Sequence, residues 1–166
     1  MKIHLIEIDP ELSPIIVPAT KRGGFVERSR RTRILVEGSP ELRHRLGSQV
    51  AVRRSVATVD DPRGALVMIK ARETAKNGLF YIGELLVTEA KVQVEGRIGI
   101  GIIAGDEPEA ARELAIIDAA FNAGLEEASE WEGALLEEEA RILRREGIEA
   151  ARIARTKVDF ESMDRG

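Results

Sequence analysis

The sequence predicts an α+β protein, in which an antiparallel β-sheet of about four strands packs against C-terminal α-helices. Residues 50–104 are rich in β-branched side chains and carry the turn signals Asn77-Gly78 and Glu95-Gly96. Strands joined by such short turns must be antiparallel, because a parallel return needs a crossover of a dozen or more residues. After residue 106, apolar residues recur at spacings of three and four, which is typical of an amphipathic helix.

The N-terminal part contains one predicted strand and one clear helix start. Residues 3–8 alternate apolar and polar side chains, and a Pro-rich, linker-like stretch then runs to Gly23-Gly24. Residues 27–33 are ambiguous by periodicity, although their Arg and Glu residues favour a helix. Ser39-Pro40 places a capping residue before a proline at the first helical position, and we expect this helix to end at Gly47.

The predicted strands are short and are separated by turns. They comprise residues 50–59, 65–70, 79–88, 91–94 and 97–104. A turn cluster at Asp60–Gly64 separates the first two. Gly99 and Gly101 precede a helix, but their spacing is not that of a dinucleotide-binding loop, and the acidic residues that follow would repel a pyrophosphate. We therefore interpret them as positions where another backbone or helix packs closely.

The C-terminal part is predicted to be helical up to about residue 154. Asp106 and Glu109 resemble a capping box, and the helix that follows should end near Gly124. Residues 125–154 read as two helices or as one kinked helix, interrupted at Gly147. Glu139 and Glu146 share an angular sector with the apolar residues Ala128, Trp131, Leu135, Ile142 and Ile153. Part of that face should therefore contact something other than a dry core.

Composition excludes several kinds of chemistry. The 166 residues include no Cys and only two His, His4 and His44. Disulfides, Cys-ligated zinc, iron–sulfur clusters and thiol nucleophiles are excluded, and a His-rich metal site built by this chain alone is not expected. We expect no metal site, and we find no Ser–His–acid arrangement, H-E-x-x-H motif or paired-carboxylate spacing. With no apolar run long enough for a signal peptide or a membrane span, a soluble cytoplasmic protein is expected.

Charge is distributed unevenly along the chain. The net charge is −4, but residues 21–54 carry ten basic and three acidic residues, a net +7. Residues 84–146 carry six basic and sixteen acidic residues, a net −10. Such polarity suits steered association with an anionic ligand or a partner protein. The alternative is that both segments are ordinary solvated faces.

The basic segment supplies the candidate anion-binding residues. These are Arg43, His44, Arg45, Arg53 and Arg54. Arginines bind phosphate groups through bidentate hydrogen bonds. The segment lacks interleaved aromatic residues for base stacking, so contact with phosphate or with a partner fits better than recognition of nucleic acid.

Two acidic residues are candidates for a structural or functional role. Asp118 lies about 70° from the centre of the apolar stripe of its predicted helix. A carboxylate at the edge of a core should be paired, and an Arg of the basic segment is the expected partner, with catalysis as the alternative. Glu84, on a predicted strand, is the second candidate.

Two regions of the sequence resemble a known family. They are Gly83-Glu84-Leu85-Leu86-Val87-Thr88-Glu89-Ala90-x-Val92, followed by Gly96, Gly99, Gly105 and Ala111-x-x-x-Ala115-x-Ile117-Asp118-Ala119, and the tail Lys157-Val158-Asp159-Phe160-Glu161-Ser162-Met163-Asp164-Arg165-Gly166. Both are similar to the PhnG subunit of the bacterial carbon–phosphorus lyase system, and the tail is the most specific element. The resemblance covers residues 28–166, which we take as an α+β domain, and residues 1–27 are a strand-like, Pro-rich extension without a counterpart in that family.

The resemblance implies membership of a core complex with PhnH-, PhnI- and PhnJ-type subunits. In that family PhnG acts with PhnI to join an alkylphosphonate to C1′ of a nucleoside triphosphate, with release of the base. The nucleosidase chemistry is attributed to the PhnI-type subunit. This chain is therefore expected not to be catalytic alone and to bind no cofactor by itself, with the nucleoside triphosphate as substrate of the complex. A homo-oligomer is left open.

Departures from the family pattern concern Glu89, Ile100 and Asp106, where the family usually has a basic residue, an aromatic or His, and Arg or Lys. The residues expected at a partner interface belong to the tail: Val158, Asp159, Phe160, Met163 and Arg165. The alternative functions are a free-standing anion- or nucleic-acid-binding protein that uses residues 21–54, and a small lone hydrolase.

Overall fold

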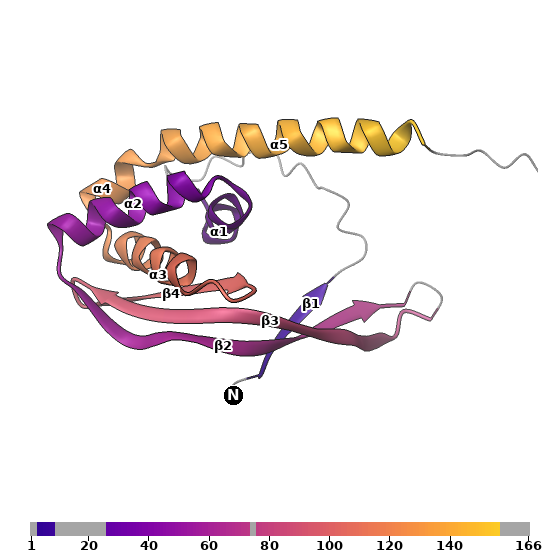
Figure 1. Ribbon diagram of the computed structural model, residues 1–166, viewed down its shortest axis with the longest axis horizontal. Coiled ribbons are helices and arrows are strands. Elements are labelled where there is room, and N and C mark those ends of the chain that lie inside the picture. The colour runs from indigo at the N-terminus through magenta and orange to yellow at the C-terminus, as the bar shows by residue number, and fades with distance from the viewer. Residues whose placement is uncertain (1–2, 9–25, 74–75, 157–166) are drawn as a thin grey trace, which may run out of the picture.

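The computed structural model describes residues 3–8, as backbone, and residues 26–73 and 76–156. In chain order the elements are β1 (Ile3–Ile8), α1 (Arg28–Glu37), α2 (Pro40–Arg53), β2 (Val56–Arg72), β3 (Leu79–Val94), β4 (Arg97–Ala104), α3 (Pro108–Ala123), α4 (Glu126–Glu130) and α5 (Glu132–Ala154). The strands form one sheet in the order β1-β2-β3-β4. Figure 1 shows α3 lying on one face of this sheet, α1 and α2 above it, and α5 across the top.

The sheet differs from the prediction in strand count and direction. Three strands, β2, β3 and β4, are antiparallel as predicted, but β1 joins the edge of β2 in parallel. Four antiparallel strands are therefore not confirmed. A parallel strand is possible here because residues 9–55 between β1 and β2 include two helices, which provide the long crossover.

Three predicted strand boundaries were wrong. Residues 50–53 are the last turn of α2, and the supposed turn at Asp60–Gly64 lies inside β2. The pairing of β2 with β3 shifts register between Thr58 and Asp60 and again between Asp60 and Arg63, so bulges absorb the turn-forming residues. Residues 79–88 and 91–94 likewise form a single strand, β3.

The predicted hairpin turns are confirmed. Asn77, with a φ of 57°, lies in the connection between β2 and β3, where the Glu73 N–H donates to the Gly78 carbonyl oxygen over 2.9 Å. Glu95 and Gly96 both have positive φ angles, 48° and 75°, and connect β3 to β4 in two residues. This is the backbone conformation that a tight hairpin requires.

The start of α2 and the end of α3 were predicted correctly, but the end of α2 was not. Ser39 caps α2, because its hydroxyl oxygen accepts from the Leu42 N–H over 3.3 Å. The predicted end at Gly47 was wrong: α2 continues to Arg53, and a glycine inside a helix costs only about 1 kcal/mol. Gly124 ends α3 in the left-handed conformation as predicted.

The predicted capping box and the predicted break at Gly147 were both wrong. The N-cap of α3 is Glu107, without a side-chain cap, and its N–H donates instead to the Thr88 hydroxyl oxygen over 2.9 Å. The C-terminal region does form two helices, but they meet at Trp131. The indole N–H of Trp131 donates to the Gln49 side-chain oxygen over 2.8 Å, which fixes the junction against α2.

Gly99 and Gly101 allow α3 to lie directly on β4. A Cβ atom at Gly99 would lie 2.1 Å from the Ala115 carbonyl oxygen, and one at Gly101 would lie 1.9 Å from the Ala111 carbonyl oxygen. The close packing expected from the sequence is therefore confirmed. The main core lies around this contact, and its largest fully buried members include Ile34, Leu46, Val50, Val92, Ile117 and Leu135.

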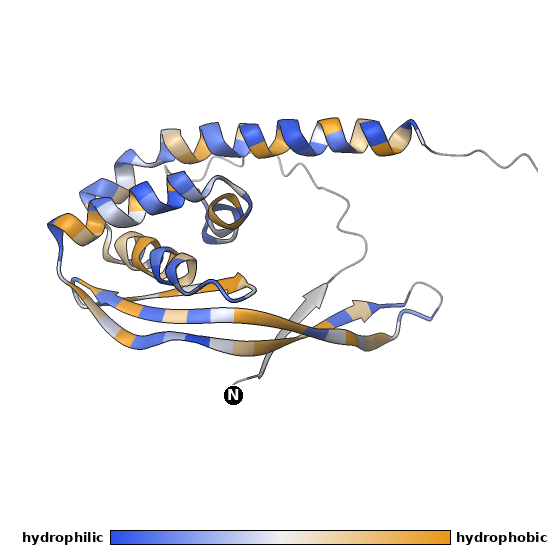
Figure 2. Ribbon diagram, in the orientation of Figure 1, coloured by the Kyte–Doolittle hydropathy of each residue, from blue (hydrophilic) through white to orange (hydrophobic). Residues whose placement is uncertain are grey.

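The core covers only part of the sheet. We call the remainder the distal arm and define it as residues 66–72 of β2 and 79–86 of β3. β4 pairs with β3 only between Val87 and Val94, and Figure 1 shows that α1, α2 and α3 lie over that end. Figure 2 shows apolar residues continuing along both strands into the distal arm.

Candidate functional site

Asp118 is the centre of a cluster that joins α1, α3 and β4. The Arg28 guanidinium donates to both carboxylate oxygens, over 3.0 Å to Oδ1 and 2.7 Å to Oδ2. Arg31 adds a third bond of 3.4 Å to Oδ1. Both arginines belong to the basic segment, as the sequence indicated. The arrangement is that of a structural ion pair, because both oxygens of the Asp118 carboxylate accept hydrogen bonds from the scaffold elements α1, α3 and β4.

Arg31 is a buried cation held from two sides. It is 7% exposed, and its guanidinium carbon lies 3.8 Å from the centre of the Phe121 ring. Burial lowers the pKa of Arg31, while the charge of Asp118 opposes this effect. The cation is thus stabilised by one carboxylate and one aromatic face, and it ties α1 to α3.

The same cluster closes the outer edge of β4. The Ile100 N–H donates to Asp118 Oδ2 over 3.1 Å, and the Asn122 amide donates to the Ile98 carbonyl oxygen over 2.8 Å. These are backbone groups that a neighbouring strand would otherwise use. Side chains of α3 therefore occupy part of an exposed sheet edge.

The acidic residues on the apolar sector of α5 pair with arginines of α1. Glu139 accepts two bonds from Arg30, one of them 2.6 Å from Nε to Oε1, and Glu146 accepts one of 2.6 Å from Arg33. These bonds lower the pKa of Glu139 and raise that of Arg30. The expectation that this sector contacts something other than a dry core is confirmed.

The candidate anion-binding residues do not converge on one surface. Arg43 and His44 share Glu113, at 3.1 Å from Arg43 Nε to Oε2 and 2.7 Å from His44 Nδ1 to Oε1. Arg53 and Arg54 share Glu127, at 3.8 and 3.3 Å. The carboxylates of the acidic segment thus occupy four of the five candidates, and the anion-binding role stays a prediction.

Glu127 is held ionised by its surroundings. It is 3% exposed, and its own backbone N–H, at the start of α4, is the main cause that lowers its pKa, with Arg54 as a further cause. The pair links the C-terminal end of α2 to α4. It fixes the position where the chain turns from α3 toward α5.

Arg45, the fifth candidate, lines a shallow pocket between α2 and α5. Three carboxylates share this pocket, those of Glu41, Glu137 and Glu138. The carboxylate of Glu138 already has hydrogen-bond partners, because it accepts from the Ser39 N–H over 2.8 Å and from Arg141 over 3.0 Å. The pocket is therefore of mixed charge, which does not favour a polyanion.

A buried acidic residue on the sheet was missed by the sequence reasoning. Glu89 is 3% exposed and lies 3.1 Å from Lys91 Nζ, which in turn lies 2.9 Å from Asp60 Oδ2. Hydrogen bonds to Asp60 and Glu89 raise the pKa of Lys91. The spacing of Glu89 and Lys91 on one face of a strand was visible in the sequence, but Asp60 was assigned to a turn, so the cluster was not assembled.

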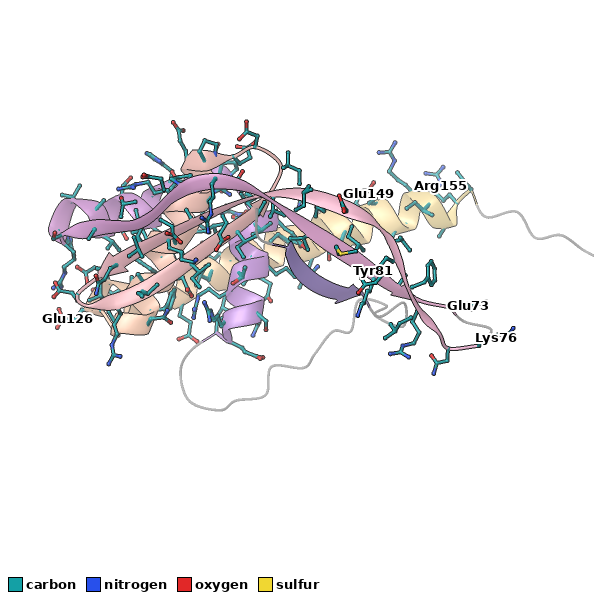
Figure 3. The ribbon with its side chains drawn as sticks, turned by 90° about the horizontal axis from the view of Figure 1, so that it is seen from below. Glu73, Lys76, Tyr81, Glu126, Glu149 and Arg155 are labelled. Atoms are coloured by element: carbon teal, nitrogen blue, oxygen red, sulfur yellow. The ribbon has the colours of Figure 1, made fainter. Side chains whose placement is uncertain are left out.

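The distal arm exposes a dense group of large apolar side chains. Their exposed fractions are 44% for Leu79, 49% for Phe80, 51% for Tyr81, 55% for Ile82, 38% for Leu85 and 48% for Leu86. Glu84, the second candidate acid, lies among them, is exposed and makes no ion pair within the described part of the chain. Figure 3 shows Tyr81 on this arm, with Glu73 and Lys76 at its tip.

The C-terminal half of α5 is also apolar and exposed. Leu143 is 47% exposed, Ile148 66% and Ile153 65%, although Ile142 in the first half is 3% exposed. Figures 1 and 3 show this half of the helix, with Glu149 and Arg155, extending toward the same end of the molecule as the distal arm. The distal arm and the C-terminal half of α5 thus both extend beyond the core, toward the same end of the molecule.

Some expectations concern residues that the structure does not describe. The tail residues Val158, Asp159, Phe160, Met163 and Arg165 lie outside the described residues, as does most of the N-terminal extension, of which β1 and residues 26–27 are described. Among residues 26–73 and 76–156, no group of three or more His, Asp or Glu side chains could hold a metal ion. None of the described helices is both long and apolar enough to cross a membrane.

Comparison with known proteins agrees with the resemblance seen in the sequence. The family described as phosphonate metabolism protein PhnG matches residues 26–166. The subunit PhnG of alpha-D-ribose 1-methylphosphonate 5-triphosphate synthase from Rhizobium meliloti (strain 1021) is 34% identical over 112 residues, which cover 67% of this chain and 71% of that protein. The predicted family is thereby confirmed, and the chain belongs to the PhnG family of phosphonate metabolism proteins.

Proposed function

We propose that this chain is the PhnG subunit of a carbon–phosphorus lyase core complex. With a PhnI-type subunit it transfers an alkylphosphonate to C1′ of a nucleoside triphosphate, and the base is released. Family membership supports this proposal, and the Rhizobium relative carries the name of a subunit of a ribose 1-methylphosphonate 5-triphosphate synthase. PhnH- and PhnJ-type subunits complete the complex, and the nucleoside triphosphate is bound by the complex rather than by this chain alone.

The apolar distal arm is the observation that carries this proposal. Monomeric proteins rarely expose contiguous apolar patches of large size, and such patches mark interaction sites. Here six large apolar residues between Leu79 and Leu86 are each more than a third exposed. The exposed half of α5 extends toward the same end. A partner subunit that covers both elements would continue the core beyond its present end.

The charged clusters have a supporting role in this proposal. Arg28 and Arg31 hold α1 to α3 through Asp118, and Arg30 holds α1 to α5 through Glu139. These pairs fix the helices from which α5 extends. We assign them to scaffold stability and assign the chemistry of the transfer to the PhnI-type subunit.

The test compares the purified chain, the PhnI-type subunit from the same organism, and their mixture. Formation of the bond between methylphosphonate and C1′ of the nucleoside triphosphate should occur at a high rate only in the mixture, because release of the base without transfer needs only the nucleosidase chemistry assigned to the PhnI-type subunit. Equal activity of the PhnI-type subunit with and without this chain would contradict the accessory role. Turnover by this chain alone would instead favour the lone hydrolase.

A pair of variants locates the docking surface. Phe80→Asp should abolish copurification with the PhnI-type subunit, because a carboxylate at the centre of an apolar contact would be buried without a partner. The isolated variant should keep its melting temperature, since Phe80 is already 49% exposed. Val52→Asp is the matched control, because Val52 is 85% exposed on α2, away from the distal arm. Wild-type recovery of the partner with Phe80→Asp would remove the distal arm from the proposal.

A further inference from the structure

Among the described residues, one outer edge of the distal arm is paired with a strand, and the other is not. On the β2 side, β1 pairs in parallel with residues 66–71, from Ile3 opposite Leu66 to Ile8 opposite Ala71. On the β3 side, β4 ends at Ala104, opposite Val87, and the chain then leaves the sheet. In the part of the chain that the structure describes, no strand pairs with the outer edge of residues 79–85.

The backbone of this edge is directed outward at Glu84. The Gly105 N–H donates to the Leu86 carbonyl oxygen over 2.9 Å, so Leu86 presents its backbone groups to the β4 side. In an antiparallel strand these directions alternate, so the backbone groups of Leu85 are directed toward β2. The N–H and C=O of Glu84 therefore point away from the sheet, at the centre of the unpaired edge.

Parts of two other edges are covered in the described part of the chain, whereas the outer edge of residues 79–85 has no strand on it. Asp118 and Asn122 occupy backbone groups of β4, and β1 covers β2. Proteins protect exposed edges with charges, proline, bulges or covering elements. A bulge at Ile82, where Ile69 lies opposite Gly83 and Lys70 opposite Tyr81, interrupts this edge. Residues 79–86 otherwise contain one charged residue, Glu84, and no proline, among six exposed large apolar side chains. A long apolar edge of this kind is a template for an added strand.

We propose that the outer edge of β3 between Leu79 and Leu86 is a strand-acceptor site for an extended segment of a partner subunit. This inference rests on the proposed function, because it takes the occupant from the complex in which this chain is a subunit. Main-chain hydrogen bonds to Glu84 and its neighbours supply affinity, and the exposed apolar side chains select apolar residues at alternate positions of the incoming strand.

The chemistry of the occupant follows from two features of the arm. The segment Ile-His-Leu-Ile-Glu-Ile of β1, already added to the opposite edge, shows that an alternating apolar strand fits this stretch of sheet. Opposite Glu84 we expect a Lys or Arg, since opposite charges directly across a strand pair stabilise it. A second copy of this chain, paired symmetrically about Glu84, would instead place two carboxylates opposite each other, which is repulsive.

Glu84→Pro and Glu84→Ala separate strand addition from side-chain contact. Proline removes the outward N–H and blocks pairing at that position, whereas the sheet of this chain does not use that N–H. In copurification with the PhnI-type subunit, Glu84→Pro should lower the recovered partner by roughly tenfold or more, and Glu84→Ala by about twofold or less. The circular dichroism spectrum of each isolated variant reports whether it is folded.

Hydrogen exchange of the wild-type chain is a second test of the strand-acceptor site, and it does not depend on a variant. The amide of Glu84 should exchange fast in the isolated chain and at least about a hundredfold more slowly in the complex, as expected for an amide in a paired strand. Wild-type assembly of Glu84→Pro, or equal exchange of residues 79–86 in both states, would overturn the strand-acceptor site. If Glu84→Pro does not fold, the exchange measurement alone decides.

The outcomes also separate this inference from the proposed function. If Phe80→Asp prevents assembly but Glu84→Pro does not, the arm docks through its side chains and only strand addition is wrong. If neither variant affects assembly, the docking surface is wrong as well. If light scattering shows that the isolated chain is a dimer and Glu84→Pro makes it monomeric, the occupant is a second copy, and the partner-strand proposal is overturned.

Discussion

The two ends of this molecule are built on different principles, although the same two strands, β2 and β3, run through both. At one end, β4 joins the sheet, α1, α2 and α3 lie over it, and arginines of α1 and α2 pair with carboxylates of α3, α4 and α5. At the other end, the distal arm exposes apolar side chains on strands that only β1 accompanies. The charged side chains of the first end pair with one another within the chain. The second end has an exposed apolar surface that another molecule can cover.

This contrast explains the uneven charge of the sequence. The basic segment and the acidic segment suggested docking, but most of the basic residues pair with carboxylates of the acidic segment inside the chain. Uneven charge along a sequence is therefore weak evidence for an external ligand when the two segments fold together. The apolar run in residues 79–82, which composition alone does not reveal, is the stronger indication of a partner.

The largest expected effect is at the packed end. Gly101→Ala places a methyl group 1.9 Å from the Ala111 carbonyl oxygen of α3, so the helix must move. We expect a loss of more than about 3 kcal/mol in the free energy of unfolding, above the usual range for overpacking. Gly83→Ala, in the distal arm, is the matched control because nothing lies within 4 Å of its Cβ position. Urea unfolding measures the free energy of unfolding of both variants. Similar losses in the two would contradict the difference between the packed end and the distal arm.

A smaller effect is expected at the ion cluster of α1 and α3. Asp118→Asn leaves Arg31 buried without a carboxylate and should lower the free energy of unfolding by about 2–3 kcal/mol, somewhat less than the removal of a fully buried pair because Arg28 is 60% exposed. Glu84→Gln, on the exposed arm, should change it by less than about 0.5 kcal/mol. Equal effects of the two variants in thermal unfolding would show that the cluster contributes nothing to the scaffold.

The smallest effect concerns pH and the pairing of α1 with α5. Hydrogen bonds from Arg30 lower the pKa of Glu139, so the folded state binds a proton at this site less readily than the unfolded chain does. The stability that Glu139 contributes is therefore complete above the ordinary glutamate pKa of about 4.3 and is lost as the pH falls through the lower folded value. At pH 7, Glu139→Gln should cost less than about 1 kcal/mol, because Arg30 is 37% exposed and solvent screens the pair.

The measurement is the pH dependence of the difference in the free energy of unfolding between the wild type and Glu139→Gln. Denaturant unfolding of the wild type and of Glu139→Gln should give curves that converge as the pH falls below about 4. A difference that stays constant between pH 7 and pH 3 would show that protonation of Glu139 is not its source.

Local signals in the sequence predicted the packed end well. Ser39 was recognised as a cap, Gly99 and Gly101 as a close contact, and Asp118 as a partner of the basic segment, because each depends on a few neighbouring residues or on one helical face. Gly47 was misread as a helix end and Gly147 as an interruption, because a single internal glycine costs a helix only about 1 kcal/mol and both helices run through it.

The long-range features could not be read from one sequence. The bulges at Asp60 depend on the register against β3, and without them the cluster of Glu89 and Lys91 could not be assembled. The parallel pairing of β1 depends on a crossover through two helices. The exposure of residues 79–86 follows from where β4 ends, which is a property of the whole sheet.

The absence of cysteine allows a direct test of the central claim, that the distal arm is covered by a partner subunit. Phe80→Cys and Val52→Cys each place a single thiol in the chain, and the rate of modification by a maleimide can be followed with and without the PhnI-type subunit. We predict that the Phe80→Cys thiol reacts at least about tenfold more slowly in the complex, since burial excludes reagent and disfavours the thiolate, and that the Val52→Cys thiol reacts at an unchanged rate. Equal rates for Phe80→Cys in the two states would contradict the account.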